Sequence, residues 1–146
     1  MLNNIKNKNS NYYNILANLY RNISTEKSIE LYAEAAKIEQ HKKNKAKYYH
    51  NIASLIYEQN QNEKFEIAIE YCNKALECNR NFDYSKKLIL FLTAFHEQES
   101  QVMTKINILI EKFGYNKGKM HRKIINELKK YSETESKVEL LKKELK

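Results

Sequence analysis

The chain of 146 residues lacks several residue types that shape other folds. It has no proline, no tryptophan and only two glycines, Gly114 and Gly118. Proline and glycine form most tight turns, so a chain almost without them is poorly suited to a β fold with many turns. We therefore expect long helices joined by short polar connections, with the clearest break at the two glycines. The length suggests one domain.

Patterns for catalysis and metal binding are also missing. The only two cysteines, Cys72 and Cys78, lie on one predicted helix with their side chains about 120° apart, so they cannot pair. The four histidines are isolated and show no metal-binding spacing. No glycine-rich loop is present to hold a phosphate, and Asp83 is the only aspartate. We expect no enzymatic activity, no metal and no cofactor.

The chain has no long apolar run. The most apolar stretch, Leu88 to Phe95, covers 8 residues, whereas a membrane-spanning helix needs about 20. The segment from Met1 to Asn11 is polar and lacks the apolar core of a secretory signal. Free thiols in a lysine-rich chain are typical of a reducing compartment. The sequence therefore predicts a soluble, cytoplasmic protein without membrane insertion.

The formal net charge is +8, and the basic residues gather at the ends. Residues 1–50 and 115–146 each carry a net charge of +5, whereas residues 51–114 carry −2. A basic balance favours partners such as nucleic acid or an anionic surface. A genome rich in A and T offers another explanation, because 23 lysines accompany only 3 arginines and nucleic-acid sites favour arginine.

Apolar residues recur with helical spacing along most of the chain, which predicts about seven to eight helices in an all-α fold. Five of them have approximate bounds at residues 10–21, 45–59, 63–78, 83–97 and 100–113. A further helix follows an N-cap at Ser24 or Thr25. Another lies beyond Gly118, and the last carries Val138, Leu141 and Leu145, as a solvated cap or a coiled-coil-like seam.

A pattern of large aromatic, aliphatic, small and large residues, followed by small residues at helical spacing, occurs twice. The first copy comprises Tyr13, Leu16, Ala17, Tyr20, Ala33 and Ala36. The second comprises Tyr49, Ile52, Ala53, Ile56, Ala68, Cys72 and Ala75. Small residues at this spacing let two antiparallel helices approach closely, so the pattern indicates a helical repeat.

These positions resemble the tetratricopeptide (TPR) repeat, with Ile29, Ala33 and Ala36 as the second-helix positions of the first copy. The resemblance implies a right-handed superhelix of antiparallel helix pairs. It divides the chain into a flexible N-terminus at 1–9, a repeat domain at 10–114 and a basic helical cap at 115–146. The repeat domain then holds two degenerate repeats and a helical hairpin at 83–114. The terminal proline is absent, the second copy carries extra residues at 60–62, and a plain helical bundle is the alternative.

In TPR proteins the first helix of each repeat lines a concave groove that binds a peptide or protein. The groove positions carried over to this chain are Asn11, Asn14, Asn18, Arg21, Lys47, His50, Ser54 and Tyr57. A subclass of the family holds a C-terminal carboxylate with a Lys/Asn set, of which only Asn18 and Asn51 match here. The resemblance thus implies a non-enzymatic adaptor or scaffold.

Two basic stretches are candidates for phosphate contact. They contribute Lys42, Lys43, Lys45, Lys117, Lys119, Arg122 and Lys123. Solvated helix ends are the alternative reading, because basic residues near helix ends need no further role. The alternative function is therefore a nucleic-acid-associated component of a ribonucleoprotein or other large assembly, and a third is a sensor module like the peptide-receptor half of bacterial quorum regulators. Self-association through the C-terminal helix is compatible with all three.

Overall fold

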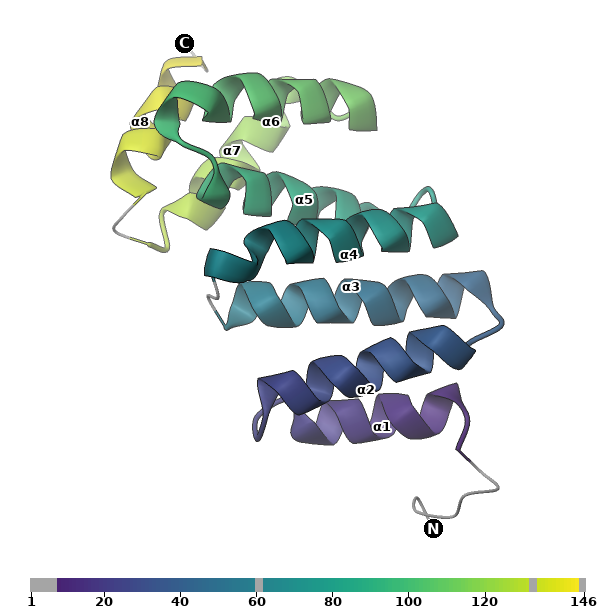
Figure 1. The fold of residues 1–146 in the computed structure, drawn as a ribbon. Coiled ribbons are helices and arrows are strands. Elements are labelled where there is room, and N and C mark those ends of the chain that lie inside the picture. Colours follow the sequence, from purple (N-terminus) through teal and green to yellow (C-terminus); the bar gives the residue numbers. More distant parts are fainter. Residues whose placement is uncertain (1–7, 60–61, 132–133, 145–146) are drawn as a thin grey trace. The chain divides into compact units, whose positions relative to one another are not determined.

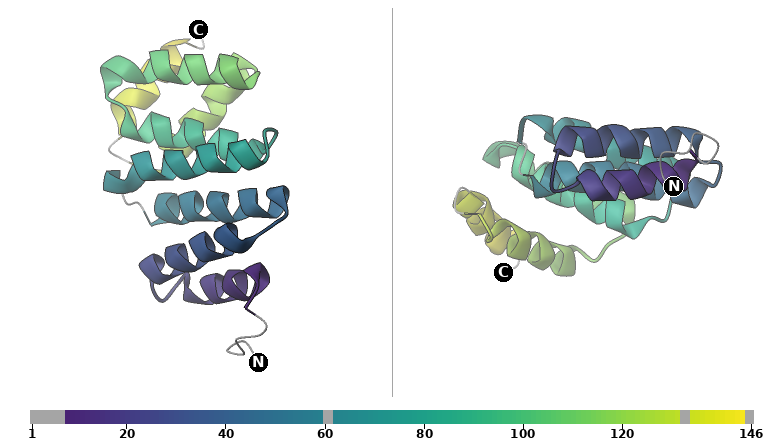
Figure 2. Two further views of the ribbon diagram at one scale, coloured as in Figure 1. Left: turned by 45° about the vertical axis from the view of Figure 1, so that its right-hand side comes forward. Right: turned by 90° about the horizontal axis from the view of Figure 1, so that it is seen from below.

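A computed structural model describes residues 8–59, 62–131 and 134–144 (Figures 1 and 2). These residues form eight α-helices and one short 3-10 helix, with no strand among them, so the prediction of an all-α fold is confirmed. The helices are α1 Ser10–Tyr20, α2 Thr25–Ile38, α3 Lys42–Glu58, α4 Phe65–Cys78, α5 Asp83–His96, α6 Glu99–Phe113, α7 Lys117–Leu128 and α8 Glu135–Glu144, with η2 at Asn62–Lys64. The segment expected to be flexible lies mostly outside the described residues, but its last residue, Asn9, caps α1.

The chain divides into two compact units, an N-terminal unit (Met1–Ser85) and a C-terminal unit (Lys86–Lys146), with the division inside α5. The sequence places its clearest break at Gly114. That glycine ends α6, as predicted, and it does so in the left-handed conformation (φ 75°) without separating two units. The helix pair predicted at 83–114 therefore lies mostly in the C-terminal unit, together with α7 and α8.

The helices of the N-terminal unit pack in chain order: α1 against α2, α2 against α3, and α3 against α4 (Figures 1 and 2). The small residues Ala17, Ala53 and Ala68 are fully buried, as the repeated pattern predicts. Small side chains shorten the distance at which two helix axes can pack. The aromatic residues that open the two copies, Tyr13 and Tyr49, are only half-buried.

The buried face of α2 begins one residue earlier than predicted. Ile29 and Ala33, which were expected in the core, are partly exposed. The hydroxyl of Ser28 donates a hydrogen bond of 2.8 Å to the carbonyl oxygen of Ala17, which satisfies this small polar side chain inside the core. The fully buried positions of α2 that share the spacing of Ala68, Cys72 and Ala75 in α4 are Ser28, Tyr32 and Ala35.

The start of α3 is also earlier than predicted, at Lys42, so that the basic stretch forms its first turn. His41 occupies the N-cap position without a side-chain cap. The carboxylate of Glu39 instead accepts hydrogen bonds from the backbone N–H groups of Gln40 and His41, at 3.1 and 3.3 Å, and from the Ser10 hydroxyl at 3.0 Å. Glu39 thereby fixes the connection before α3 to the start of α1.

The C-terminal unit encloses a core of its own, to which α6, α7 and α8 contribute. Val138 and Leu141 are buried in this core, at 5% and 0% exposure. The two described residues of the stripe on α8 are therefore not available for self-association, and that prediction is wrong for them. Leu145, its third member, lies outside the described residues.

Lys137 on α8 forms hydrogen bonds to the end of α5, and a substitution can test how much they stabilise the C-terminal unit. Its ammonium donates to the carbonyl oxygens of Ala94 and Phe95, at 2.9 and 2.7 Å, in the last turn of α5. Burial lowers the pKa of Lys137, while Glu97 and Glu99 oppose that effect. We expect Lys137→Met to lower the free energy of unfolding by about 1–2 kcal/mol, because two charge-assisted hydrogen bonds are lost. Urea unfolding measures this change.

The matched control is Lys142→Met, which removes an exposed ion pair with Glu139 on the same helix. Exposed pairs of this type contribute about 0.5 kcal/mol or less. Equal losses in the two variants would contradict the role of Lys137 as a cap of α5.

Candidate functional site

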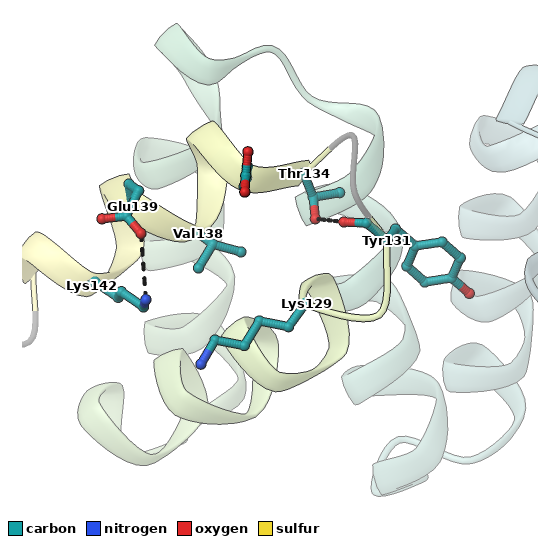
Figure 3. A pocket seen from close by; sticks show the side chains of 7 residues that line it. Lys129, Tyr131, Thr134, Val138, Glu139 and Lys142 are labelled. Carbon is teal, nitrogen blue, oxygen red and sulfur yellow. Dashed lines mark hydrogen bonds and ion pairs between the residues drawn. The ribbon is translucent and has the colours of Figure 1, made fainter.

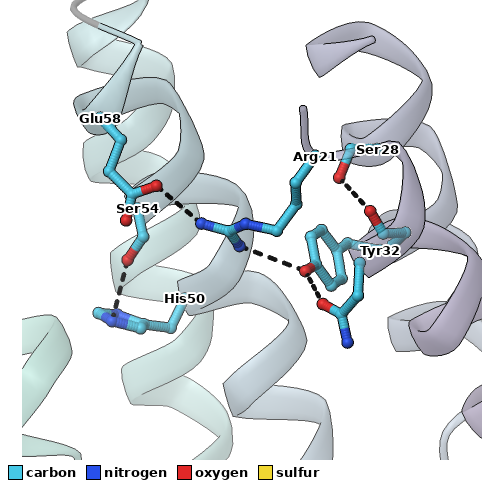
Figure 4. Close-up of polar contacts among 8 residues, drawn as sticks. Arg21, Ser28, Tyr32, His50, Ser54 and Glu58 are labelled. Carbon is cyan, nitrogen blue, oxygen red and sulfur yellow. Dashed lines mark hydrogen bonds and ion pairs between the residues drawn. The ribbon is translucent and has the colours of Figure 1, made fainter. Parts of the chain in front are cut away.

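A group of polar side chains joins the end of α1 to α2 and α3 in the N-terminal unit (Figure 4). The hydroxyl of Tyr32 donates to the side-chain oxygen of Asn18 and accepts from Nη1 of Arg21 at 3.3 Å. The other terminal nitrogen of Arg21 donates to Oε2 of Glu58 at 2.7 Å. These contacts hold the guanidinium between a fully buried tyrosine and a carboxylate that is 55% exposed.

The guanidinium of Arg21 remains accessible, with 27% of its side chain exposed. Burial by itself lowers the pKa of Arg21, but the hydrogen bond to Tyr32 and the nearby Glu58 outweigh it, so the pKa is raised. Arg21 is therefore a fixed positive charge. Because Tyr32 and Glu58 limit the rotamers of Arg21, this side chain loses less conformational entropy when a ligand contacts it.

A second polar group surrounds His50 in the middle of α3. Its Nδ1 lies 2.9 Å from the hydroxyl of the buried Ser85, and its Nε2 lies 3.1 Å from the hydroxyl of Ser54. The rings of Phe82 and Tyr84 lie 5.1 and 6.2 Å from the imidazole. Burial lowers the pKa of His50 to about 4, so the ring is neutral at pH 7 and one nitrogen donates while the other accepts.

The two groups form one surface, which we call the polar face: Asn18, Arg21, His50, Ser54 and Glu58. His50, Ser54 and Glu58 are four residues apart along α3 and so share one side of that helix. Figure 4 shows Glu58 bonded to Arg21 and, further along α3, Ser54 bonded to His50. The polar face thus offers both donors and acceptors. It carries the opposite charges of Arg21 and Glu58, the neutral imidazole of His50, the amide of Asn18 and the hydroxyl of Ser54.

Four of the eight predicted groove residues belong to the polar face: Asn18, Arg21, His50 and Ser54. Among the others, Asn11 and Lys47 are exposed and Asn14 is half-buried. Tyr57 lies against Phe65 of α4, with their ring centroids 6.2 Å apart. Glu58 was missed, although its place one turn after Ser54 was a usable signal.

The residues proposed for phosphate contact lie in both units. Lys42 and Lys43 are exposed in the first turn of α3, and Lys45 is half-buried. Lys117 forms an ion pair of 3.5 Å with Glu144. The remaining three, Lys119, Arg122 and Lys123, are exposed on α7. His121, which lies between them in the sequence, is instead buried and bonded to Asn107 at 2.8 Å.

The C-terminal unit has a shallow pocket of about 260 Å³ between the end of α7 and α8 (Figure 3). Lys129, Val138, Glu139 and Lys142 line it, and Lys142 is paired with Glu139 at 3.4 Å. Its lining carries charges of both signs, with Lys129 and Lys142 beside Glu135 and Glu139.

Among the described residues, no group of three or more His, Cys, Asp or Glu side chains is arranged to hold a metal ion. Within the same ranges, none of the helices combines the length and the apolar character that crossing a membrane requires. No protein-family model, curated protein or solved structure matches this chain.

Proposed function

We propose that the N-terminal unit is a TPR-like, non-enzymatic binding module that holds an extended peptide or protein segment on the polar face. The observation that carries the proposal is the gathering of predicted groove residues from α1 and α3 on one surface, with Arg21 held in place by Tyr32 and Glu58. Packing of helices in chain order and small residues at repeated spacing support the TPR-like arrangement of the two helix pairs.

The chemistry of the polar face suits an uncharged or mildly acidic segment. An extended backbone presents alternating N–H and C=O groups. Glu58 and Asn18 can accept hydrogen bonds from its N–H groups, and Arg21 and Ser54 can donate to its C=O groups. The neighbouring Lys47 adds a positive charge on the same helix. A carboxylate clamp is not supported, because it requires a lysine where α1 carries Asn14.

Selection of random peptides displayed on phage against the full chain tests this proposal. We expect enriched peptides whose affinity falls about tenfold or more in the Arg21→Gln variant, since a desolvated charged hydrogen bond contributes about 1.5–3 kcal/mol. Affinity is measured by fluorescence anisotropy with the enriched peptide. The matched control is Lys27→Gln, which removes one exposed positive charge from the start of α2.

Amide hydrogen exchange then locates the contact. A bound peptide should protect α1 and α3 and leave α6–α8 unchanged. Failure to enrich any peptide, equal affinity of the two variants, or protection confined to the C-terminal unit would each refute the proposal. Circular dichroism confirms that Arg21→Gln remains helical.

A further inference from the structure

One side of α7 carries only basic and amide side chains. We call it the α7 stripe: Lys119, Arg122 and Lys123 on α7, its C-cap residue Lys129, and Asn126 between them. At about 100° per residue, these five positions fall within a sector of about 120°. All five are exposed. Lys129 also lines the pocket that contains Glu135 and Glu139. Lys117 projects from a different side of the helix, where it pairs with Glu144.

The opposite side of α7 anchors the helix. Its buried residues are Met120, His121, Ile124, Ile125 and Leu128. Folding of the C-terminal unit therefore depends on that apolar side, and the α7 stripe contributes no burial to it. Within residues 62–131 and 134–144, no ion pair joins a cation of the stripe to a carboxylate of this unit.

The stripe is unfavourable for the helix that carries it. Lys119 is three and four residues before Arg122 and Lys123, and like charges at these spacings repel each other. Lys119 also lies in the first turn, where the helix dipole favours acidic residues. The structure has no acidic residue in that turn. An anionic partner that neutralises the stripe would remove both penalties.

We infer that the α7 stripe binds the sugar–phosphate backbone of a nucleic-acid duplex without sequence preference. From Lys119 to Lys129 the helix rises about 15 Å, which places four cations along several consecutive phosphates of one strand. Lysine acts as a point charge toward phosphate, whereas reading base edges relies on arginine, asparagine and glutamine side chains in a groove. A stripe with three lysines therefore fits the backbone better than the bases.

Three other partners fit this surface less well. Insertion into a membrane surface requires apolar side chains beside the basic ones, and the stripe has none. Single-stranded nucleic acid is bound by stacking on aromatic side chains, which are also lacking in this sector. Protein interfaces have aromatic and apolar anchors at their centre and are depleted in lysine. The duplex backbone is the remaining anion with a regular row of charges.

Fluorescence anisotropy of the full chain with labelled DNA and RNA duplexes of about 20 base pairs tests the inference between about 50 and 200 mM salt. Four neutralised phosphates give an expected slope of about −3.6 in log K against log salt. For the double variant Lys119→Gln/Lys123→Gln we expect affinity at low salt to fall about tenfold or more, and the slope to become shallower by about 2.

The matched control is Lys42→Gln/Lys43→Gln, which removes the same charge from exposed positions on α3. We expect it to keep the slope of the unmodified chain. Absence of salt-dependent binding, equal losses in the two double variants, or a loss only in the α3 variant would overturn the inference.

A competition experiment tests whether the α7 stripe prefers a nucleic-acid duplex to other polyanions. Polyglutamate or vesicles rich in phosphatidylserine, at equal concentration of negative charge, should displace the duplex at least tenfold less well than unlabelled duplex. Equal displacement by either competitor would overturn the assignment to a nucleic-acid backbone. A preference for the DNA or the RNA probe would identify which duplex the stripe binds.

Discussion

Replacing Tyr32 by alanine is expected to lower the free energy of unfolding of the N-terminal unit by about 4 kcal/mol. Tyr32 is fully buried in α2, and its hydroxyl bonds both Asn18 and Arg21. Truncation to alanine leaves a cavity the size of an aromatic ring and removes two hydrogen bonds. In Tyr32→Phe only the hydroxyl is lost, and water can replace it at the partly exposed Arg21, so we expect a loss of about 1 kcal/mol.

Urea unfolding followed by circular dichroism measures both changes. Because the chain has two compact units, amide hydrogen exchange is needed to assign the loss: exchange should become faster in α1–α3 and stay unchanged in α6–α8. The matched control is Tyr84→Ala, since Tyr84 is 71% exposed, and we expect it to cost less than about 1 kcal/mol.

Two results would contradict this account of Tyr32. Equal losses in Tyr32→Ala and Tyr84→Ala would mean that burial of the ring contributes little. A loss in Tyr32→Phe as large as that in Tyr32→Ala would mean that the hydroxyl network, and not the ring, stabilises α2 against its neighbours. The intermediate value expected for Tyr32→Phe separates the two contributions.

The periodicity of apolar residues was sufficient to predict the helices, because most helices in the described residues bury one side. The exception is α5, in which the consecutive residues Leu88, Ile89 and Leu90 are all buried. The pattern was less reliable for the register of α2. Ser28 is polar and was not considered as a core residue, yet it is buried because its hydroxyl bonds the Ala17 carbonyl oxygen. A satisfied hydroxyl can occupy a core position that a hydropathy pattern assigns to the surface.

The division inside α5 could not be predicted from local signals. A continuous helix crosses it, and the only strong sequence break, at Gly114, ends a helix within one unit. Where compact units divide depends on which helices share a core, and that is a property of contacts between distant residues. The burial of His121 has a similar cause, because its partner Asn107 lies on a different helix.

Four of the eight predicted groove residues belong to the polar face, but the contact that positions Arg21 was not predicted. The resemblance to the TPR repeat implied that Asn18, Arg21, His50 and Ser54 belong to one groove. It could not show that Tyr32, a core residue of α2, supplies the hydroxyl that positions Arg21. The polar face therefore depends on a contact between a buried residue and a surface residue, which no pattern within one helix contains.

Acid should destabilise the protein through His50. Burial lowers the pKa of this side chain from its ordinary 6.5 to about 4. Between these two pH values the unfolded chain binds a proton at His50 that the folded chain does not bind, so the free energy of unfolding falls as the pH decreases through this window. A full shift of this size corresponds to about 3 kcal/mol. Because the ring is only partly buried, we expect about 1–2 kcal/mol.

The variant His50→Gln removes this titration and keeps a side chain that can bond Ser54 or Ser85. We expect it to be less stable than the unmodified chain at pH 7 and to lose about 1–2 kcal/mol less between about pH 6.5 and 4. Urea unfolding at the two pH values measures the difference. The control is His41→Gln, which replaces an exposed histidine at the start of α3. Equal changes in the two variants would contradict a specific role of His50.

His121 should remain as a second source of acid sensitivity, because burial and then the nearby Lys117 lower its pKa, while Glu144 acts in the opposite direction. We therefore expect His50→Gln to remove only the part of the acid sensitivity that arises in the N-terminal unit. An unchanged pH dependence in His50→Gln would show that His50 titrates alike in the folded and unfolded chains. Since both serine hydroxyls can accept hydrogen bonds from a protonated ring, the expected acid sensitivity arises from burial and not from loss of hydrogen bonds.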